Sequence, residues 1–262
     1  MLNYIRAEIY KVLHRKYTYI VLGTLLALEA LFVSGFAFHN AHSFPTPFGQ
    51  AVVSIVYMGG IGFCTCLLTG DMVFAGQYKN STLKNEVSFG LGRTRIYLGK
   101  LIAMILLSVA YMVIVVGFYL GACAIVLPLD TVEGFYSAES GLAIVGYFLA
   151  VAFPLWIGAQ AAVCMCLFLI RSDVGASIAA LGLTMAGHTV IEVAGILCST
   201  YSDPLGDALV QISRHMPGFM MGRAKEVIGD PVFLGKAWIV GVFWLVVCTA
   251  IGLYGFKRKE IK

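Results

Sequence analysis

Residues 96–127 read IYLGKLIAMILLSVAYMVIVVGFYLGACAIVL, and this stretch decides the class of fold. Lys100 is its only charged residue. A helix of about 20 apolar residues crosses the hydrocarbon core of a bilayer, so this stretch is long enough to span a membrane. Because lipid offers backbone groups no hydrogen-bond partner, the spanning segment is predicted to be a helix.

Five other apolar runs extend this pattern over the whole chain. Only 12% of the 262 residues are charged and 60% are hydrophobic, whereas a soluble domain carries about 25% charged residues. No run alternates as the strands of a membrane β-barrel do. We therefore predict an all-α membrane protein, a single transmembrane domain over 1–262, with a kink at Pro154 in the fourth span. The six predicted spans are 17–38, 48–70, 96–127, 141–170, 174–198 and 232–256.

The basic residues predict the orientation of these spans. With the N-terminus inside, fourteen of the eighteen Lys and Arg lie in cytoplasmic segments, as the positive-inside rule requires. The sequence thus predicts a multi-pass membrane protein with both termini in the cytoplasm. The net charge of +4 reflects this topology, and we expect no nucleic-acid partner.

Two segments outside the spans have helical periodicity. Residues 1–16 alternate apolar and basic positions at helical spacing, which predicts an amphipathic helix on the inner membrane surface, in contact with lipid, a partner protein or both. Residues 199–231 carry apolar residues three and four apart. We expect two short helices there, on the extracellular side before the last span, dipping into the outer leaflet or covering the bundle.

The sequence offers no catalytic or metal-binding residues. It contains no Gly-x-x-x-x-Gly-Lys-[Ser/Thr] loop for ATP. Ser177 and His188 would lie about 16 Å apart along one helix, too far for a nucleophile and its base. The paired cysteines, Cys64 with Cys66 and Cys164 with Cys166, cannot aim both thiolates of a pair at one ion from a helix. We predict that the chain is not an enzyme and holds no cofactor.

Ionisable residues inside the spans are candidates for function. Glu29 falls in the first span and Glu192 in the fifth, where such residues are costly. His188 precedes Glu192 by four residues, so the two share a helix face. One interpretation is a polar lining for a substrate path formed by Glu29, His188 and Glu192. The other is a protonated glutamate that hydrogen-bonds between helices.

Residues 71–95 form a basic island between the second and third spans. Apolar and aromatic residues recur through it at roughly helical spacing, among them Phe74, Tyr78 and Leu83. A solvated loop has no need of such side chains. We predict a short helix, ended by Gly90 and Gly92, that docks on another protein.

The island resembles the corresponding segment of ABC-2 type ABC transporter permeases, in particular small bacterial exporters of the antimicrobial-peptide immunity kind. In that family a similar sequence motif follows the second span, with glycine usually at the position of Ser81. The architecture of six spans and an amphipathic N-terminal helix is also similar. The matching residues are Tyr78-Lys79-Asn80-Ser81-Thr82-Leu83-Lys84-Asn85, then Ser88, Gly90, Arg93, Tyr97 and Lys100.

The resemblance implies an exporter of an amphipathic or hydrophobic substrate, such as a peptide antibiotic, drug, lipid or glycan. ATP and magnesium would bind two copies of a separate ABC ATPase, and a second permease, identical or paralogous, would complete the transporter. The island would be the coupling helix. The ATPase-coupling residues implied are Phe74, Gln77, Tyr78, Lys79, Thr82, Leu83, Lys84 and Glu86.

Two other functions remain open from the residues alone. A proton-coupled secondary transporter would use Glu29 and Glu192 as proton sites. A membrane sensor or scaffold would transport nothing. Co-purification of an ATPase separates the ABC permease from both.

Overall fold

The computed structural model of the chain describes residues 1–42, 46–74, 77, 82–129, 134–170, 172–199 and 203–259. In these ranges every regular element is a helix. Five helices are long and apolar enough to cross a membrane, and a bent pair makes a sixth. The prediction of an all-α membrane protein is therefore confirmed, and the described residues contain five candidate spans, or six if the bent pair is one span.

The helices follow one another with short connections. In chain order they are α1 (Leu2–Leu13), α2 (Lys16–His42), α3 (Phe48–Tyr57), α4 (Ile61–Phe74), α5 (Thr82–Ser88), α6 (Arg93–Val126), α7 (Ala138–Leu169), α8 (Asp173–Leu181), the π-helical turn η1 (Gly182–Ala186), α9 (Gly187–Ser199), α10 (Asp203–Arg214), α11 (Pro217–Arg223) and α12 (Pro231–Arg258).

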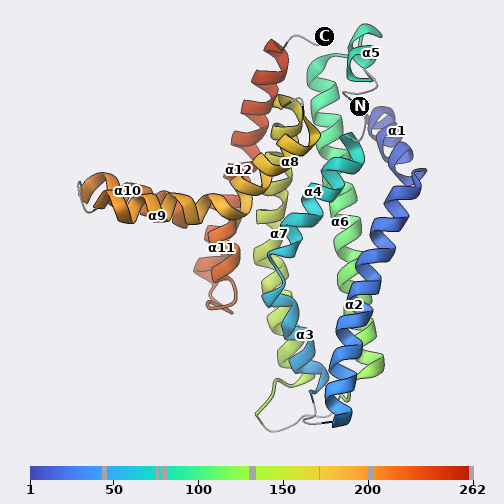
Figure 1. Cartoon of the computed structure of the whole chain (residues 1–262), viewed down its shortest axis with the longest axis vertical. Helices are drawn as coiled ribbons and strands as arrows, with labels where there is room; N and C mark the ends of the chain where they lie inside the picture. Colours follow the sequence, from blue (N-terminus) through green and yellow to red (C-terminus); the bar gives the residue numbers. More distant parts are fainter. Residues whose placement is uncertain are drawn as a thin grey trace.

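Helix α7 is at the centre of the bundle and packs against α3, α4 and α12 (Figure 1). Its contact with α12 is made by glycines. A Cβ on Gly158 would lie 2.8 Å from the Gly241 carbonyl oxygen, and a Cβ on Gly241 would collide with the Pro154 carbonyl. Small residues allow membrane helices to approach this closely. The helix also continues through Pro154 without ending there.

The predicted second span, 48–70, is two helices rather than one. Helices α3 and α4 meet at an angle of 63°. At the corner, a Cβ on Gly59 would collide with the Phe148 ring, and one on Gly62 with the Trp156 ring. The bend therefore lets the backbone of the corner lie directly against two aromatic side chains of α7.

The predicted fifth span, 174–198, is also interrupted. It qualifies as a span by length and composition, but η1 breaks the α-helical pattern, a form often associated with function. Figure 1 shows α9 turning away from the bundle and pairing with α10 in a projecting arm. Gly206 packs against Ser199 within this α9–α10 arm. Helix α11 then returns to the bundle.

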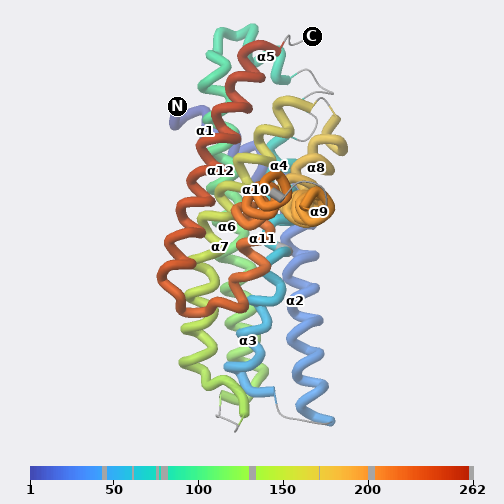
Figure 2. Tube along the Cα trace, turned by 90° about the vertical axis from the view of Figure 1, so that its left-hand side faces the viewer, coloured from blue at the N-terminus to red at the C-terminus, as the bar shows by residue number. Residues whose placement is uncertain are grey.

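The two ends of the bundle carry different elements. The first turns of α1, the last turns of α12 and the whole of α5 lie at one end (Figures 1 and 2). The end of α2 and the start of α3 lie at the opposite end, with the end of α6 and the start of α7. The short helix of the basic island is therefore held beside both ends of the chain.

Candidate functional site

A buried group of charged side chains joins α5 to α1 and α6. The Lys100 side chain is fully buried, and its Nζ lies 3.2 Å from Glu8 Oε1 and 3.5 Å from Glu86 Oε1. Lys11 Nζ lies 2.7 Å from Glu8 Oε1, and the Tyr4 hydroxyl donates to Glu86 Oε2 at 2.9 Å. These five residues form the charge cluster. It holds two carboxylates and two ammonium groups, so its formal charge is balanced.

The electrostatics of the charge cluster favour the ionised carboxylate of Glu8. Burial alone would raise the pKa of the Glu8 carboxyl, but Lys100 and Lys11 outweigh burial and hold that pKa below its usual value. Burial and the charges of Glu8 and Glu86 raise the pKa of the Tyr4 hydroxyl well above its usual value. Tyr4 therefore keeps its proton and remains a donor to Glu86.

Basic side chains cap three helix C-termini at this end of the bundle. Arg93 donates to the carbonyls of Phe256 and Lys257 at the end of α12, at 2.9 and 2.6 Å. Arg15 donates to the Met72 carbonyl near the end of α4 at 2.8 Å. Lys259 donates to carbonyls near the end of α7, Phe168 at 2.8 Å among them. Cations at helix C-termini satisfy the last carbonyls and interact favourably with the helix dipole.

Four of the predicted coupling residues are buried within the chain. Phe74 packs edge-to-face against Phe168 at 4.9 Å and is buried, as is Leu83. Gln77 is buried and donates to the Val73 carbonyl. Glu86 faces the charge cluster. All four side chains are therefore buried within the chain itself. Their role in coupling to an ATPase stays a prediction.

Other residues of α5 remain open to a partner. Lys84 is exposed and Thr82 is half-buried, while Tyr78 and Lys79 lie outside the described residues. The exposed aromatic side chain is Phe89, with 87% of its surface accessible, just before Gly90 in the left-handed conformation. The sequence analysis missed Phe89 because this residue comes after the periodic apolar positions of the island. Its position directly before Gly90, which ends the helix, was the signal that could have identified it.

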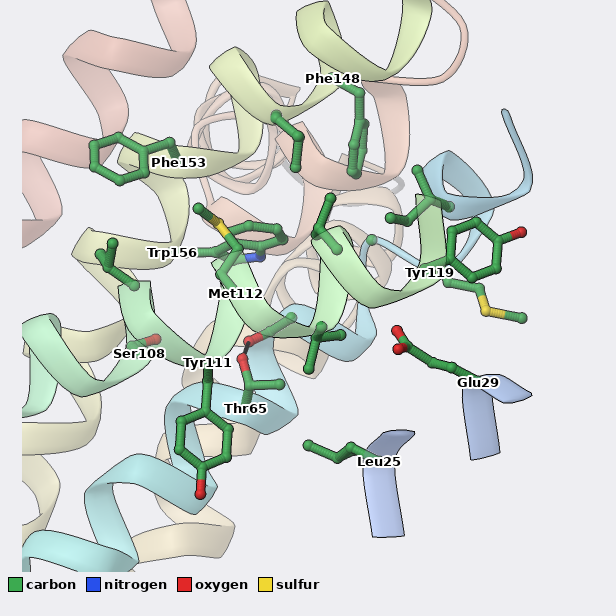
Figure 3. Close-up of a pocket in the computed structure, with 18 of the residues that line it drawn as sticks. Leu25, Glu29, Thr65, Ser108, Tyr111, Met112, Tyr119, Phe148, Phe153 and Trp156 are labelled. Atoms are coloured by element: carbon green, nitrogen blue, oxygen red, sulfur yellow. Dashed lines mark hydrogen bonds between the residues drawn. The ribbon is translucent and has the colours of Figure 1, made fainter. Parts of the chain in front are cut away.

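A cavity of about 310 Å³ lies between α2, the α3–α4 corner, α6 and α7 (Figure 3). Its walls are mostly apolar, with Phe148, Phe153 and Trp156 from α7 and Leu25 and Phe32 from α2. This size is within the range of small-molecule sites. The cavity is partly open, so a ligand could enter between the helices.

Most polar groups around this cavity are satisfied by the protein. The Tyr119 hydroxyl donates to the Ala51 carbonyl at 2.7 Å, and the Tyr111 hydroxyl donates to the Thr18 carbonyl at 2.8 Å. Gln160 is bonded to Thr69 and to the Cys66 carbonyl. Two atoms differ: Glu29 Oε2 and Trp156 Nε1 are shielded from solvent and have no hydrogen-bond partner among the described residues.

The three intramembrane residues proposed as one substrate path lie in different places. Glu29 lines the cavity described above. His188 lines a second cavity of about 220 Å³ together with Tyr57 and Lys225. Glu192 is half-buried in the α9–α10 arm and lines neither cavity. The turn of α9 away from the bundle separates it from Glu29, so a joint lining is not formed within this chain.

The long apolar helices and the short helix held at one end define a multi-pass helical membrane protein. A family model described as ABC-2 family transporter protein matches residues 4–187, from the first turn of α1 to the start of α9. The chain belongs to this family, whose members are membrane permeases of ABC transporters that work with an ABC ATPase. A comparison with curated proteins gave no match.

Proposed function

We propose that the chain is the permease subunit of an ABC exporter, which moves an amphipathic or hydrophobic substrate outward with ATP hydrolysed on a separate subunit. Two such permeases, identical or paralogous, would pair with two ATPases that carry ATP and magnesium. The chain would lie in the bacterial cytoplasmic membrane, with α1, α5 and the end of α12 on the cytoplasmic side. Peptide antibiotics are one substrate class in this proposal.

The observation that carries the proposal is the attachment of α5 to the bundle. Lys100, at the start of α6, is paired with Glu86 on α5 and Glu8 on α1. A force on α5 would therefore act on α6 directly, as coupling of ATPase movement to the spans requires. The outward side of α5 offers Lys84 and Phe89 as contacts for an ATPase.

Purification of the tagged chain from its native membrane in mild detergent tests the proposal. We expect an ABC ATPase to accompany the chain, identified by mass spectrometry, and ATP hydrolysis to be retained. The chain with Phe89→Ala serves as the matched variant, since this side chain is exposed and its loss leaves the bundle intact. Transport by the reconstituted chain alone, driven by a proton gradient without any ATPase, would contradict the proposal.

A proton-coupled carrier that uses Glu29 and Glu192 together finds no support in the geometry, because the two residues lie on elements that diverge. The sensor or scaffold alternative is tested by the same purification: the absence of any accompanying ATPase, together with no transport by the reconstituted chain, would favour it.

A further inference from the structure

The Glu29 cavity contains an unmatched pair of polar groups. Glu29 Oε2 is an acceptor without a donor, and Trp156 Nε1–H is a donor without an acceptor. They come from α2 and α7, and Figure 3 shows the Glu29 carboxylate directed toward the space that the other lining side chains enclose. A Cβ on Gly62 would collide with the ring edge that carries Trp156 Nε1, so this N–H faces the α3–α4 corner. Buried polar groups normally have partners, so the carboxylate of Glu29, which lines the cavity, points to a ligand that supplies a donor.

We propose that this cavity binds an amphiphile with a protonated amine for Glu29 and an apolar body. An ammonium group is favoured over a neutral donor because it would also compensate a carboxylate in an apolar setting, where an unpaired charge is costly.

The apolar body would lie between α6 and α7. The rings of Phe148 and Phe153 and the side chains of Ile105 and Val116 line that part of the cavity. The glycines at the α3–α4 corner help to form the site, because Gly59 and Gly62 carry no side chain that would displace Phe148 and Trp156. The site is built within one chain and needs neither a second permease nor an ATPase, so it does not depend on the proposed function.

Two sources could supply this chemistry. One is a membrane lipid with an ethanolamine head group, whose amine and phosphate lie close together. The other is a soluble cationic amphiphile with an amide or ester. Both sources present an ammonium group to Glu29, and the experiment separates them.

Binding is measured on the purified full chain in phosphatidylcholine nanodiscs. With Trp238→Phe and Trp244→Phe, Trp156 is the one tryptophan left, and its fluorescence reports occupancy. The soluble probe is the dodecyl ester of glycine, which carries an ammonium group and an ester. Its control is dodecyl acetate, which has the ester and the chain but no amine. For the lipid arm, phosphatidylethanolamine is added to the nanodiscs and bound lipid is counted by native mass spectrometry.

We expect the cationic probe to bind at least tenfold more tightly than the neutral one. Glu29→Gln should abolish that preference and leave the neutral probe unchanged. Glu192→Gln, the same change on a helix outside the cavity, should have no effect. Val116→Phe should weaken both probes by filling the apolar part. Retention of phosphatidylethanolamine that is lost in Glu29→Gln would identify the lipid as the occupant; response to the soluble probe alone would identify the soluble source.

Equal binding of the two soluble probes together with no phosphatidylethanolamine retained would overturn the proposal. It would also be overturned if Glu29→Gln, while folded by size-exclusion chromatography and thermal unfolding, bound both ligands like the parent. An equal loss in Glu192→Gln would likewise contradict a site at Glu29.

Discussion

Lys100 Nζ lies 3.2 Å from Glu8 Oε1, and both side chains are almost completely buried. Lys100 lies about two turns into α6, and Glu8 is on the N-terminal amphipathic helix α1, 92 positions earlier in the chain. Their contact means that α1 is part of the packed bundle rather than only a helix on the membrane surface.

Lys100→Met should destabilise the chain strongly. The substitution leaves two carboxylates in the interior with only Lys11 nearby, and removal of one partner of a buried pair costs about 3–5 kcal/mol. Thermal unfolding in detergent measures the effect. Lys84→Met, on the exposed side of α5, should stay within about 0.5 kcal/mol of the parent. Equal midpoints for the two variants would show that the charge cluster does not stabilise the fold.

Acid should weaken the attachment of α1. Because the folded-state pKa of Glu8 lies below its unfolded value, its contribution to stability is fully present above the ordinary glutamate pKa of about 4.3. That contribution is lost as the pH falls through the lowered folded value. Thermal midpoints of the parent and Glu8→Gln should therefore converge at acid pH. The thermal midpoint of Glu139→Gln, at an exposed position, should change with pH as the midpoint of the parent does. A difference between the midpoints of the parent and Glu8→Gln that stays constant with pH would contradict the prediction.

Phe89→Ala and Leu83→Ala should have opposite effects. Leu83 is buried, so its truncation should cost about 2–5 kcal/mol of stability in the isolated chain. Phe89 is exposed, so its truncation should leave stability unchanged and weaken ATPase association by about 1.5–3 kcal/mol, the value of burying an aromatic side chain. Thermal unfolding and co-purification separate the two. Normal ATPase association in Phe89→Ala would remove Phe89 from the docking surface.

Gly241→Leu should disrupt the contact of α7 with α12. Its side chain would collide with the Pro154 carbonyl, whereas a Cβ on Gly235 of the same helix meets no atom within 4 Å. Gly235→Leu is therefore the matched control and should be tolerated. Protease resistance and thermal unfolding report the difference. Equal thermal stability of Gly241→Leu and Gly235→Leu would mean that α12 can move away from α7 without loss of stability.

Helix α10, in the predicted extracellular segment 199–231, should be on the outer side of the membrane. Asp207 is exposed on α10, so Asp207→Cys should react with a membrane-impermeant maleimide on intact cells. Lys84→Cys, on α5, should react only after the membrane is opened. The reverse pattern would invert the proposed orientation.

The sequence by itself determined the class of fold. Apolar runs such as 96–127 must be helices in lipid because every backbone group has to be bonded within its own segment. The short helix of the island was likewise predictable from local spacing and from Gly90. These are local properties, so the residues that show them are neighbours in the chain.

Only the tertiary structure decided which faces of the helices are used. Phe74, Leu83 and Glu86 had the spacing of a docking surface, yet all three are buried in the chain. Phe74 packs against Phe168 of α7. Glu86 contacts Tyr4 of α1 and Lys100 of α6. Residues 48–70 read as one span, yet glycines at its middle let α3 and α4 bend against α7. Glu29 lines a cavity because α6 and α7, which are far from it in sequence, pack close to α2. Glu192 lines no described cavity because α9 turns away from the bundle. Such contacts depend on packing between helices that are far apart in the sequence. The local spacing of apolar residues does not determine which helix packs against a given face.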